Sequence, residues 1–529
     1  MNRLIQILLL GLLCFGIFKA CDMRLYNLEN RALHADESEQ SFTFAGLYFN
    51  GDYKYNANGP HGPVLYYYPL KLVDKSFADT LDTRLLRRTL LPIFLATCAL
   101  VFFAMLARAN YDARELLLKA NPALGKLAGG VFAAIFLGLS SLSQIYSSYF
   151  IQEPFFALFS LALCFATFAF IKRPSLPAAL IVGLCAGLLQ SAKETSIIVF
   201  AALVGAWILS LLNLRNPAPQ IKAIFSKKSL SFALAALAGF ALIYCLFYSS
   251  FFANPAGILD GVKSYAHFFG KSVSEVHTKG FGYYFELLAG LRSQGAIFGE
   301  SAIFILAIVG TILAYLRKND FIKFTAAFGW LNVIALSFIG YKTPWLLLAP
   351  ITALALPAGY AVSAAVFSHI DLKNKILAAT LKVGLLIFVL ALLNLQYKEA
   401  KNASRNYASD PRNPFLYVHT LKSEEGLVKR IYDCAKVKGD KFKAICISNN
   451  SPWPLPWQTL KLDAVIYAKA LPQNFNPGDF DIVIYDANFD SPLSSAFPEE
   501  EWISEFFGLR ENLLLRVQVK RELFYESIK

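Results

Sequence analysis

Charged residues are scarce in this chain. Asp, Glu, Lys and Arg make up 16% of its 529 residues, whereas 56% of the residues are hydrophobic. Soluble domains are nearer to one quarter charged, so this shortage excludes a wholly soluble fold. Phenylalanine and tyrosine are abundant instead, with 46 and 25 copies, which is typical of lipid-facing and interfacial surfaces. The composition predicts a protein embedded in a membrane.

Metal-binding cysteine patterns are also missing. The eight cysteines include no CxxC pair and no other metal-ligand spacing. Five of them lie inside apolar runs, where cysteine behaves as a small hydrophobic residue: Cys14, Cys98, Cys164, Cys185 and Cys245. Only Cys434 and Cys446 lie in a polar segment. These two cysteines form either a disulfide or two free thiols, and we favour the free thiols.

Long apolar runs of spanning length recur along the first 400 residues, and we expect about eleven transmembrane helices. They lie near 4–20, 89–107, 127–145, 154–171, 177–191, 195–213, 230–250, 299–316, 322–340, 345–367 and 377–396. The first follows Arg3 and reads as a retained signal anchor, because Lys19 disfavours a lipoprotein cleavage site at Cys21. The polar residues 190–195 interrupt a run too long for one pass, so we expect two helices joined by a tight reversal there.

The net charge of +13 does not require a nucleic-acid partner, because the basic residues concentrate in alternate connections between the apolar runs. The short connection 144–152 carries no basic residue. The positive-inside rule places the basic connections in the cytoplasm, and the first loop (21–88), the 251–298 loop and the tail on the outer face. The basic connections carry Arg108, Arg114, Lys119 and Lys126; Lys172 and Arg173; Arg215, Lys222, Lys227 and Lys228; and Arg317, Lys318 and Lys323.

Composition changes near residue 400, where Pro, Asn, Asp and Lys become frequent. Strand-like segments at 444–447, 465–468, 482–485 and 513–519 alternate with helical patterns near 423–437 and 499–507. The predicted fold is therefore an α-helical polytopic membrane domain over 1–399, with a chemically important first outer loop at 21–88. An extracytoplasmic α/β domain over 400–529 follows it.

An adjacent carboxylate pair, Asp36 and Glu37, lies in the segment that begins at Arg31, about ten residues after the end of the first apolar run. A carboxylate just above the bilayer can accept a proton from a substrate that docks from outside. The alternative is structural, since acidic residues here also fit the first turn of a helix that runs on past Phe42. The juxtamembrane position makes us favour chemistry, with Asp36 as the catalytic group and Glu37 beside it.

Further polar groups fall on the same predicted face, and each has a structural alternative. His61, Tyr66 and Tyr67 form either a docking surface or a turn followed by an interfacial aromatic belt. Glu153 begins a helix, where the helix dipole alone would favour it. Lys193 either pairs with Glu194 or meets a phosphate, and Lys342 either snorkels to the interface or binds one. Tyr284 belongs to the long 251–298 loop and would line the same cavity.

Several of these segments together resemble the polytopic glycosyltransferases of the C superfamily, which include protein O-mannosyltransferases and aminoarabinose transferases. Among them the chain is most similar to the flippase-activity-associated family of protein glycosylation. The matching segments are HADE at 34–37, YNANGPHGPVLYY at 55–67, SSYFIQE at 147–153, AKET at 192–195, YKTPWL at 341–346, NPFLYVHT at 413–420 and WPLPW at 453–457. In such families a basic residue often precedes the position of Glu153, whereas here it is Gln152.

The resemblance implies transfer of a sugar, with inversion, from a polyprenyl-phosphate donor to a glycan, lipid or protein acceptor at the outer face of a bacterial or archaeal plasma membrane. Asp36 would then act as catalytic base beside Glu37. Lys342, Lys193 and His61 would bind the donor phosphate, and Glu153, Tyr66, Tyr67 and Tyr284 would line the cavity. No cofactor is required, although the pattern is compatible with a divalent metal. The alternatives are a lipid-linked sugar flippase or its accessory protein, and a structural scaffold.

Overall fold

The computed structural model describes residues 2–26, 28, 31–51, 53–59, 61–73, 81–109, 122–212, 226–272, 278–367, 375–488, 493 and 496–529. Four of the basic loop residues named above lie outside these ranges: Arg114, Lys119, Arg215 and Lys222. The chain forms two compact units. The membrane unit comprises Met1–Glu29, Asp52–Ala408 and Arg412–Phe415, and the sheet unit comprises Asn30–Gly51, Ser409–Pro411 and Leu416–Lys529.

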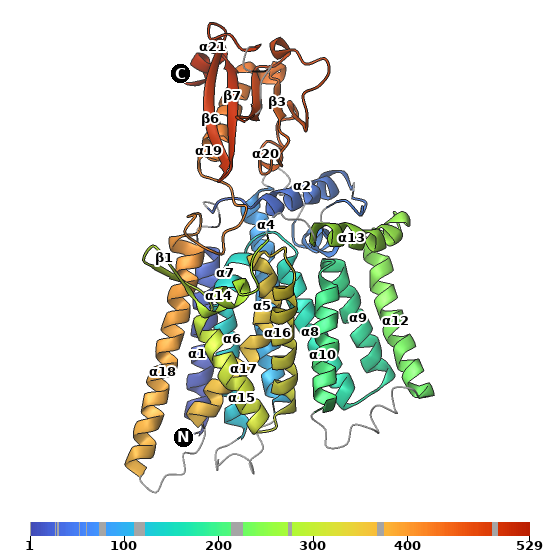
Figure 1. Ribbon diagram of the computed structural model, residues 1–529, viewed down its shortest axis with the longest axis vertical. Helices are drawn as coiled ribbons and strands as arrows, with labels where there is room; N and C mark the ends of the chain where they lie inside the picture. The colour runs from blue at the N-terminus through green and yellow to red at the C-terminus, as the bar shows by residue number, and fades with distance from the viewer. Residues whose placement is uncertain are drawn as a thin grey trace. The chain divides into compact units, whose positions relative to one another are not determined.

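Apolar helices make up most of the membrane unit (Figure 1). In the described part of the chain, seven helical segments are long and apolar enough to cross a membrane, and four apolar helices are shorter. These eleven match the eleven predicted runs, so this is an integral membrane protein. The helices are α1 (Asn2–Leu25), α5 (Leu91–Arg108), α6 (Pro122–Gly138), α8 (Glu153–Lys172), α9 (Leu176–Ala192), α10 (Ser196–Leu212), α12 (Lys227–Tyr248), α15 (Ser301–Leu316), α16 (Asp320–Phe338), α17 (Leu348–Phe367) and α18 (Lys375–Lys401).

Glycines let the backbones of neighbouring helices touch. A Cβ on Gly183 of α9 would lie 1.9 Å from the carbonyl oxygen of Ala236 in α12. A Cβ on Gly310 of α15 would lie 1.8 Å from the carbonyl oxygen of Pro357 in α17. Lipid tails are as apolar as the side chains, so membrane helices associate through such close packing rather than through the hydrophobic effect.

Short elements link the long helices at one end of the bundle, the end where α8 begins and α9 ends. We call it the Glu153 end, and the other the Lys172 end. The chain alternates direction from one apolar helix to the next, which brings the following elements to the Glu153 end: α3 (Val64–Tyr67), η1 (Pro69–Lys71), α4 (Thr83–Thr89), α7 (Ser141–Tyr146), α13 (Ala256–Ser272), α14 (Tyr283–Ala289), β1 (Leu291–Ser293), β2 (Ala296–Phe298), η3 (Pro344–Leu347) and η4 (Asn402–Asn406).

A five-stranded sheet of order β4-β3-β5-β7-β6 forms the centre of the sheet unit. The strands are β3 (Ala444–Ile447), β4 (Val465–Ala468), β5 (Ile482–Asp486), β6 (Trp502–Arg510) and β7 (Leu513–Lys520). β3 pairs in parallel with β4 and β5, and β7 pairs antiparallel with β5 and β6. One core lies under α19 (Ser423–Lys438) and α21 (Arg521–Ser527), and another between Val483, Phe497 and Trp502. The predicted C-terminal α/β fold is confirmed.

One predicted helix of this unit is wrong. Residues 499–507 were expected to be helical, yet residues from Trp502 onward form strand β6, paired with β7 from Trp502↔Lys520 to Arg510↔Leu513. The acidic run 499–501 imitates the first turn of a helix. Pairing with a neighbouring strand, which a local pattern does not reveal, overrides that signal.

Residues 31–51 belong by their contacts to the sheet unit, whereas the sequence grouped them with the membrane domain. The amide of Thr420 donates to the carbonyl oxygen of Leu33 at 3.2 Å, and His34 pairs with His419 in an isolated bridge. Helix α2 (Ala35–Asn50) follows, with the ring of Phe42 edge-on to Trp453 at 5.5 Å.

Two free thiols were the favoured expectation for Cys434 and Cys446. The structure agrees, since both cysteines are free and buried.

Candidate functional site

A buried ion pair lies at the Glu153 end of the membrane unit. The Nζ atom of Lys193, in the reversal between α9 and α10, is 2.6 Å from Oε1 of Glu153 at the start of α8. Their side chains are 7% and 8% exposed. The Lys193 ammonium also lies over the ring of Trp345, 6.0 Å from its centroid. The sequence raised a Lys193–Glu194 pair as one reading, but the ion pair of Lys193 is with Glu153.

Glu194 instead contacts the His-Gly-Pro segment at residues 61–63. Its Oε2 is 2.9 Å from Nδ1 of His61, and its Oε1 accepts a hydrogen bond from the hydroxyl of Tyr55 at 3.2 Å. The ring of Tyr55 packs edge-on against Tyr248, 4.6 Å between centroids, and the Tyr248 hydroxyl donates to the carbonyl oxygen of Gln190 at 2.9 Å. These contacts connect the reversal to the first loop and to α12.

The electrostatics of Glu194 follow from this pairing. Burial by itself would raise the pKa of the carboxyl, but His61, a backbone hydrogen bond and the Lys193 charge together outweigh it and lower the pKa of Glu194 to about 2. Tyr55 responds in the opposite sense, because burial and then the Glu194 charge raise its pKa. His61 is the accessible member, with 35% of its side chain exposed against 7% for Glu194. A substrate anion can therefore reach the imidazole while Glu194 holds it in place.

Gly62 explains why this turn can come so close to the reversal. A Cβ at this position would lie 2.2 Å from the carbonyl oxygen of Ser191, which no side chain tolerates. His61 and Lys193 therefore approach each other through backbone contact between their two segments. The Lys193–Glu153 pair and the His61–Glu194 pair, which we call the paired-charge cluster, form one polar group at the Glu153 end.

Lys342 lies in the same unit but is held by backbone groups. Its Nζ donates to the carbonyl oxygens of Lys279, at 3.0 Å, and of Ile339. The residue is 2% exposed, and burial lowers the pKa of its ammonium. Tyr284 donates to the carbonyl oxygen of Thr343 at 3.1 Å. These contacts hold the connection between α16 and α17 in place.

The two predicted tyrosines differ in accessibility. Tyr66 is fully buried with its ring 4.7 Å from that of Tyr53. Tyr67 is half-buried and lies against Phe251, 4.6 Å between ring centroids. Both rings pack against other aromatic rings.

Asp36 and Glu37 occupy the first turn of α2 in the sheet unit. His34 is the N-cap, and its Nδ1 accepts the backbone amide of Asp36 at 3.1 Å. Glu37 is fully buried, whereas Asp36 is half-buried. The helix-start alternative is therefore correct as structure. It leaves Asp36 half-buried in the first turn of the helix.

Arg510 at the end of β6 connects Asp36 with a crevice that the sequence analysis missed. Burial lowers the pKa of Arg510, while the charges of Asp36 and then Asp486 act to raise it, so both carboxylates interact electrostatically with this guanidinium. The crevice, of about 310 Å³, lies at the carboxyl ends of the parallel strands β3 and β5. Its lining includes Asp486 and four amide side chains: Asn449, Asn450, Asn488 and Asn512.

The carboxylate of Asp486 is already hydrogen-bonded inside this crevice. Ser448 Oγ donates to its Oδ1 at 2.5 Å, and Asn450 Nδ2 to its Oδ2 at 3.1 Å. In doubly wound sheets ligands bind at the carboxyl ends of strands, where the strand order reverses. The signal in the sequence was the polar run after each strand, S-N-N at 448–450 and D-A-N at 486–488. Among the described residues, no three His, Cys, Asp or Glu side chains come together to hold a metal.

Solved structures of similar fold cover nearly the whole chain. ArnT from Cupriavidus metallidurans bound to undecaprenyl phosphate superposes with a TM-score of 0.58 at 11% identity, covering 97% of both chains. Its apo state gives 0.58 at 12% identity, over 96% of this chain and 98% of that one. The apo oligosaccharyltransferase of Archaeoglobus fulgidus gives 0.53 at 13% identity, over 98% of this chain and 77% of that one.

The chain has the GT-C fold. Of these neighbours, one is bound to undecaprenyl phosphate and another is an oligosaccharyltransferase. No protein-family model matches the sequence, and no curated protein sequence does. At 11–13% identity the likeness is one of backbone architecture, running through both the membrane unit and the sheet unit. The expected GT-C fold class is thereby confirmed.

Proposed function

We propose that this protein is an integral membrane glycosyltransferase that moves a sugar from a polyprenyl-phosphate donor to an acceptor at the outer face of the membrane. The observation that carries the proposal is the GT-C fold over 97% of the chain, shared with a transferase bound to undecaprenyl phosphate. The paired-charge cluster adds to this support, because buried ionisable groups in a membrane protein usually mark a functional site.

The membrane unit binds the donor. Lys193 and His61 neutralise the donor phosphate, each released in part from its carboxylate partner, Glu153 or Glu194. A pre-formed cation held by a carboxylate costs little reorganisation when charge develops on the leaving phosphate. Lys342 holds the neighbouring chain through its two carbonyl contacts and supplies positive charge nearby. Tyr67 and Tyr284 contribute to the walls of the donor cavity.

The sheet unit binds and activates the acceptor. Asp36 accepts the proton of the acceptor hydroxyl or amide as that atom attacks the anomeric carbon. The bond from that carbon to the phosphate oxygen breaks, the polyprenyl phosphate departs with the electron pair, and the configuration inverts. Glu37, the fully buried neighbour of Asp36, supplies the second carboxylate that shapes the polar cavity.

The Asp486 crevice suits an acceptor rich in hydroxyl groups. Amides offer both donors and acceptors, which is what sugar hydroxyls need. Among the described residues, the side chains of Asn449, Asn488 and Asn512 are exposed at its rim. A volume of about 310 Å³ falls within the usual range for small-molecule sites.

A flippase without transferase activity is the alternative. It would need ionisable groups along a path through both leaflets, and four helices of the bundle offer none: α9, α10, α15 and α17 contain no Asp, Glu, Lys, Arg or His. The ionisable residues of α8 stand at its two ends instead. This distribution favours a reaction at one face.

The test compares purified wild type with Asp36→Asn for release of polyprenyl phosphate from a panel of lipid-linked sugars, with membrane extract as acceptor. We expect release by wild type and a loss of at least about 100-fold in Asp36→Asn, the usual size of a general-base contribution. Asp463→Asn is the matched control, because Asp463 is an exposed carboxylate of the same unit. Equal release by all three proteins would refute the role of Asp36. Lipid translocation without release would establish the flippase.

A further inference from the structure

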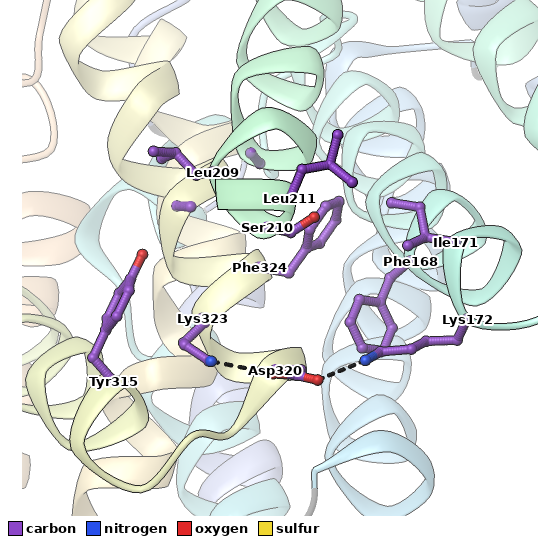
Figure 2. Close-up of a pocket in the computed structure, with 12 residues that line it drawn as sticks. Phe168, Ile171, Lys172, Leu209, Ser210, Leu211, Tyr315, Asp320, Lys323 and Phe324 are labelled. Atoms are coloured by element: carbon purple, nitrogen blue, oxygen red, sulfur yellow. Dashed lines mark hydrogen bonds and ion pairs between the residues drawn. The ribbon is translucent and has the colours of Figure 1, made fainter. Parts of the chain in front are cut away.

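A second cavity lies at the opposite end of the membrane unit from the paired-charge cluster. It has a volume of about 260 Å³ and is lined by residues of α8, α10, α15 and α16 (Figure 2). Helix α8 runs from Glu153 to Lys172, and its 20 residues span about 30 Å, the thickness of the hydrocarbon core. The cavity therefore opens at the other membrane surface, the Lys172 end, which the proposed reaction does not use.

The mouth of this cavity carries an excess of positive charge. Lys172 Nζ is 2.6 Å from Oδ2 of Asp320, and Lys323 Nζ is 3.1 Å from Oδ1 of the same carboxylate. Figure 2 shows the two ammonium groups on either side of Asp320. One carboxylate faces two cations, so the group has a formal charge of +1.

Accessibility differs between the two lysines. The Lys323 side chain is only 14% exposed and its ammonium lies over the ring of Tyr315, while Lys172 is 45% exposed above the ring of Phe168. The aromatic rings hold both cations near the cavity rather than leaving them to extend into water. An anion that enters the mouth meets two positioned donors.

The inner wall of the cavity is apolar. Phe168 and Ile171 come from α8, Leu209 and Leu211 from α10, and Phe324 from α16. A soluble anion gains nothing from such a wall, and a zwitterionic lipid gains little from the surplus charge. An anionic phospholipid uses both, because its phosphate meets the lysines at the level of the head groups while an acyl chain lies against the apolar side chains.

We propose that this cavity binds one anionic phospholipid, with its phosphate on Lys172 and Lys323 and an acyl chain against Phe168 and Phe324. The phosphate shares the lysines with Asp320 rather than replacing it. The lipid fills the gap between α8, α10 and α16, three helices that also reach the Glu153 end. Bound there, it holds the three helices together at the surface remote from the reaction.

The experiment measures lipid retained by the full-length protein in native mass spectrometry, with phosphatidylglycerol and phosphatidylcholine of identical acyl chains as probes. Wild type should retain phosphatidylglycerol in preference. The double variant Lys172→Gln/Lys323→Gln should lose at least about tenfold of that preference, given the contribution of each lysine near an anionic head group. Lys227→Gln/Lys228→Gln is the matched control, since both lysines are exposed at the start of α12 at the same end of the bundle.

A third variant makes the test independent of how well the double variant folds. Asp320→Asn raises the formal charge of the mouth from +1 to +2 and should strengthen phosphatidylglycerol retention. Weaker retention in Asp320→Asn would overturn the proposal, as would an equal loss in the Lys227/Lys228 control, which would mean general surface attraction. Full displacement of the lipid by millimolar glycerol phosphate would also overturn it in favour of a site for a soluble anion.

Discussion

At the scale of single residues, substitutions of the Lys193–Glu153 pair distinguish its contribution to stability from its contribution to sugar transfer. Removing one member of a buried ion pair leaves an uncompensated charge and typically costs about 3–5 kcal/mol. We therefore expect Lys193→Met to lower the unfolding temperature of the detergent-solubilised protein strongly. Lys193→Met/Glu153→Leu should recover most of that loss, because no charge remains buried alone. Sugar transfer should stay lost in both variants.

The control for this cycle is the exposed pair Lys263–Asp260 on α13, whose lysine side chain is 67% exposed. Surface pairs contribute about 0–1 kcal/mol, so Lys263→Met should change neither stability nor transfer. Transfer at the wild-type rate in the stable Lys193→Met/Glu153→Leu protein would show that the pair only joins α8 to the reversal.

His61 and Glu194 show what local sequence reasoning could reach. The polar residues of the reversal and of the His-Gly-Pro turn were recognisable from their interruption of apolar runs. Their partners were not, because a Lys next to a Glu in sequence suggests a local pair. In the fold the two side chains pair with different segments instead: Lys193 pairs with Glu153, and Glu194 pairs with His61.

At the scale of elements, the contact between the His61 turn and the reversal depends on Gly62. A Cβ there would meet the carbonyl oxygen of Ser191 at 2.2 Å, a backbone atom that cannot move aside cheaply. Overpacking of this kind costs about 1–3 kcal/mol. We expect Gly62→Ala to displace His61 from Glu194 and to lower both the unfolding temperature and the rate of polyprenyl phosphate release.

Gly280→Ala is the matched substitution, since its added Cβ would meet nothing within 4 Å. It should leave the unfolding temperature and the release of polyprenyl phosphate unchanged. If Gly62→Ala behaved like Gly280→Ala in both measurements, the turn and the reversal would not be in backbone contact in the membrane.

Some helices and strands are specified by local sequence patterns, and others by contacts with other parts of the chain. Apolar length, together with the polar interruption at 190–195, predicted the eleven apolar helices that the structure describes, because a bilayer needs long apolar segments to span it. Strands β3, β4, β5 and β7 were predicted from their short runs of strand-forming residues. Strand β6 was not, and neither was the assignment of α2 to the sheet unit. Strand β6 is specified by its pairing with β7, the next strand of the same hairpin. The place of α2 is specified by contacts such as that of Phe42 with Trp453, which lies far away in the chain.

At the scale of the whole molecule, one buried carboxyl group joins three distant parts of the chain. Glu300, which precedes α15, accepts hydrogen bonds from Ser140 Oγ and the Leu142 amide, both at 2.7 Å, and from Gln396 of α18 at 2.8 Å. Glu399 faces the same region from α18 and brings a second carboxylate. The sequence did not reveal this group, because the three parts of the chain that form it are more than 90 residues apart.

Burial raises the pKa of Glu300 to about 8, and the charge of Glu399 adds to the increase. The unfolded chain ionises this group near pH 4.3, so between about pH 4.3 and about 8 unfolding releases a proton. The contribution of Glu300 to the free energy of unfolding is therefore greatest below about pH 4.3 and is lost as the pH rises through about 8. The proton of neutral Glu300 has an acceptor close by, because the Gln396 side-chain oxygen has no hydrogen-bond partner among the described residues.

Glu300→Gln, which stays neutral at every pH, should remove this dependence. We expect the unfolding temperature of wild type to fall below that of Glu300→Gln progressively from about pH 5 to about pH 8, and the difference to stay constant above that. The comparison between the two proteins cancels the titration of the groups that do not interact with Glu300. A difference that is the same at both ends of this range would mean that Glu300 is already ionised in the folded protein, with Ser140, Leu142 and Gln396 compensating its charge.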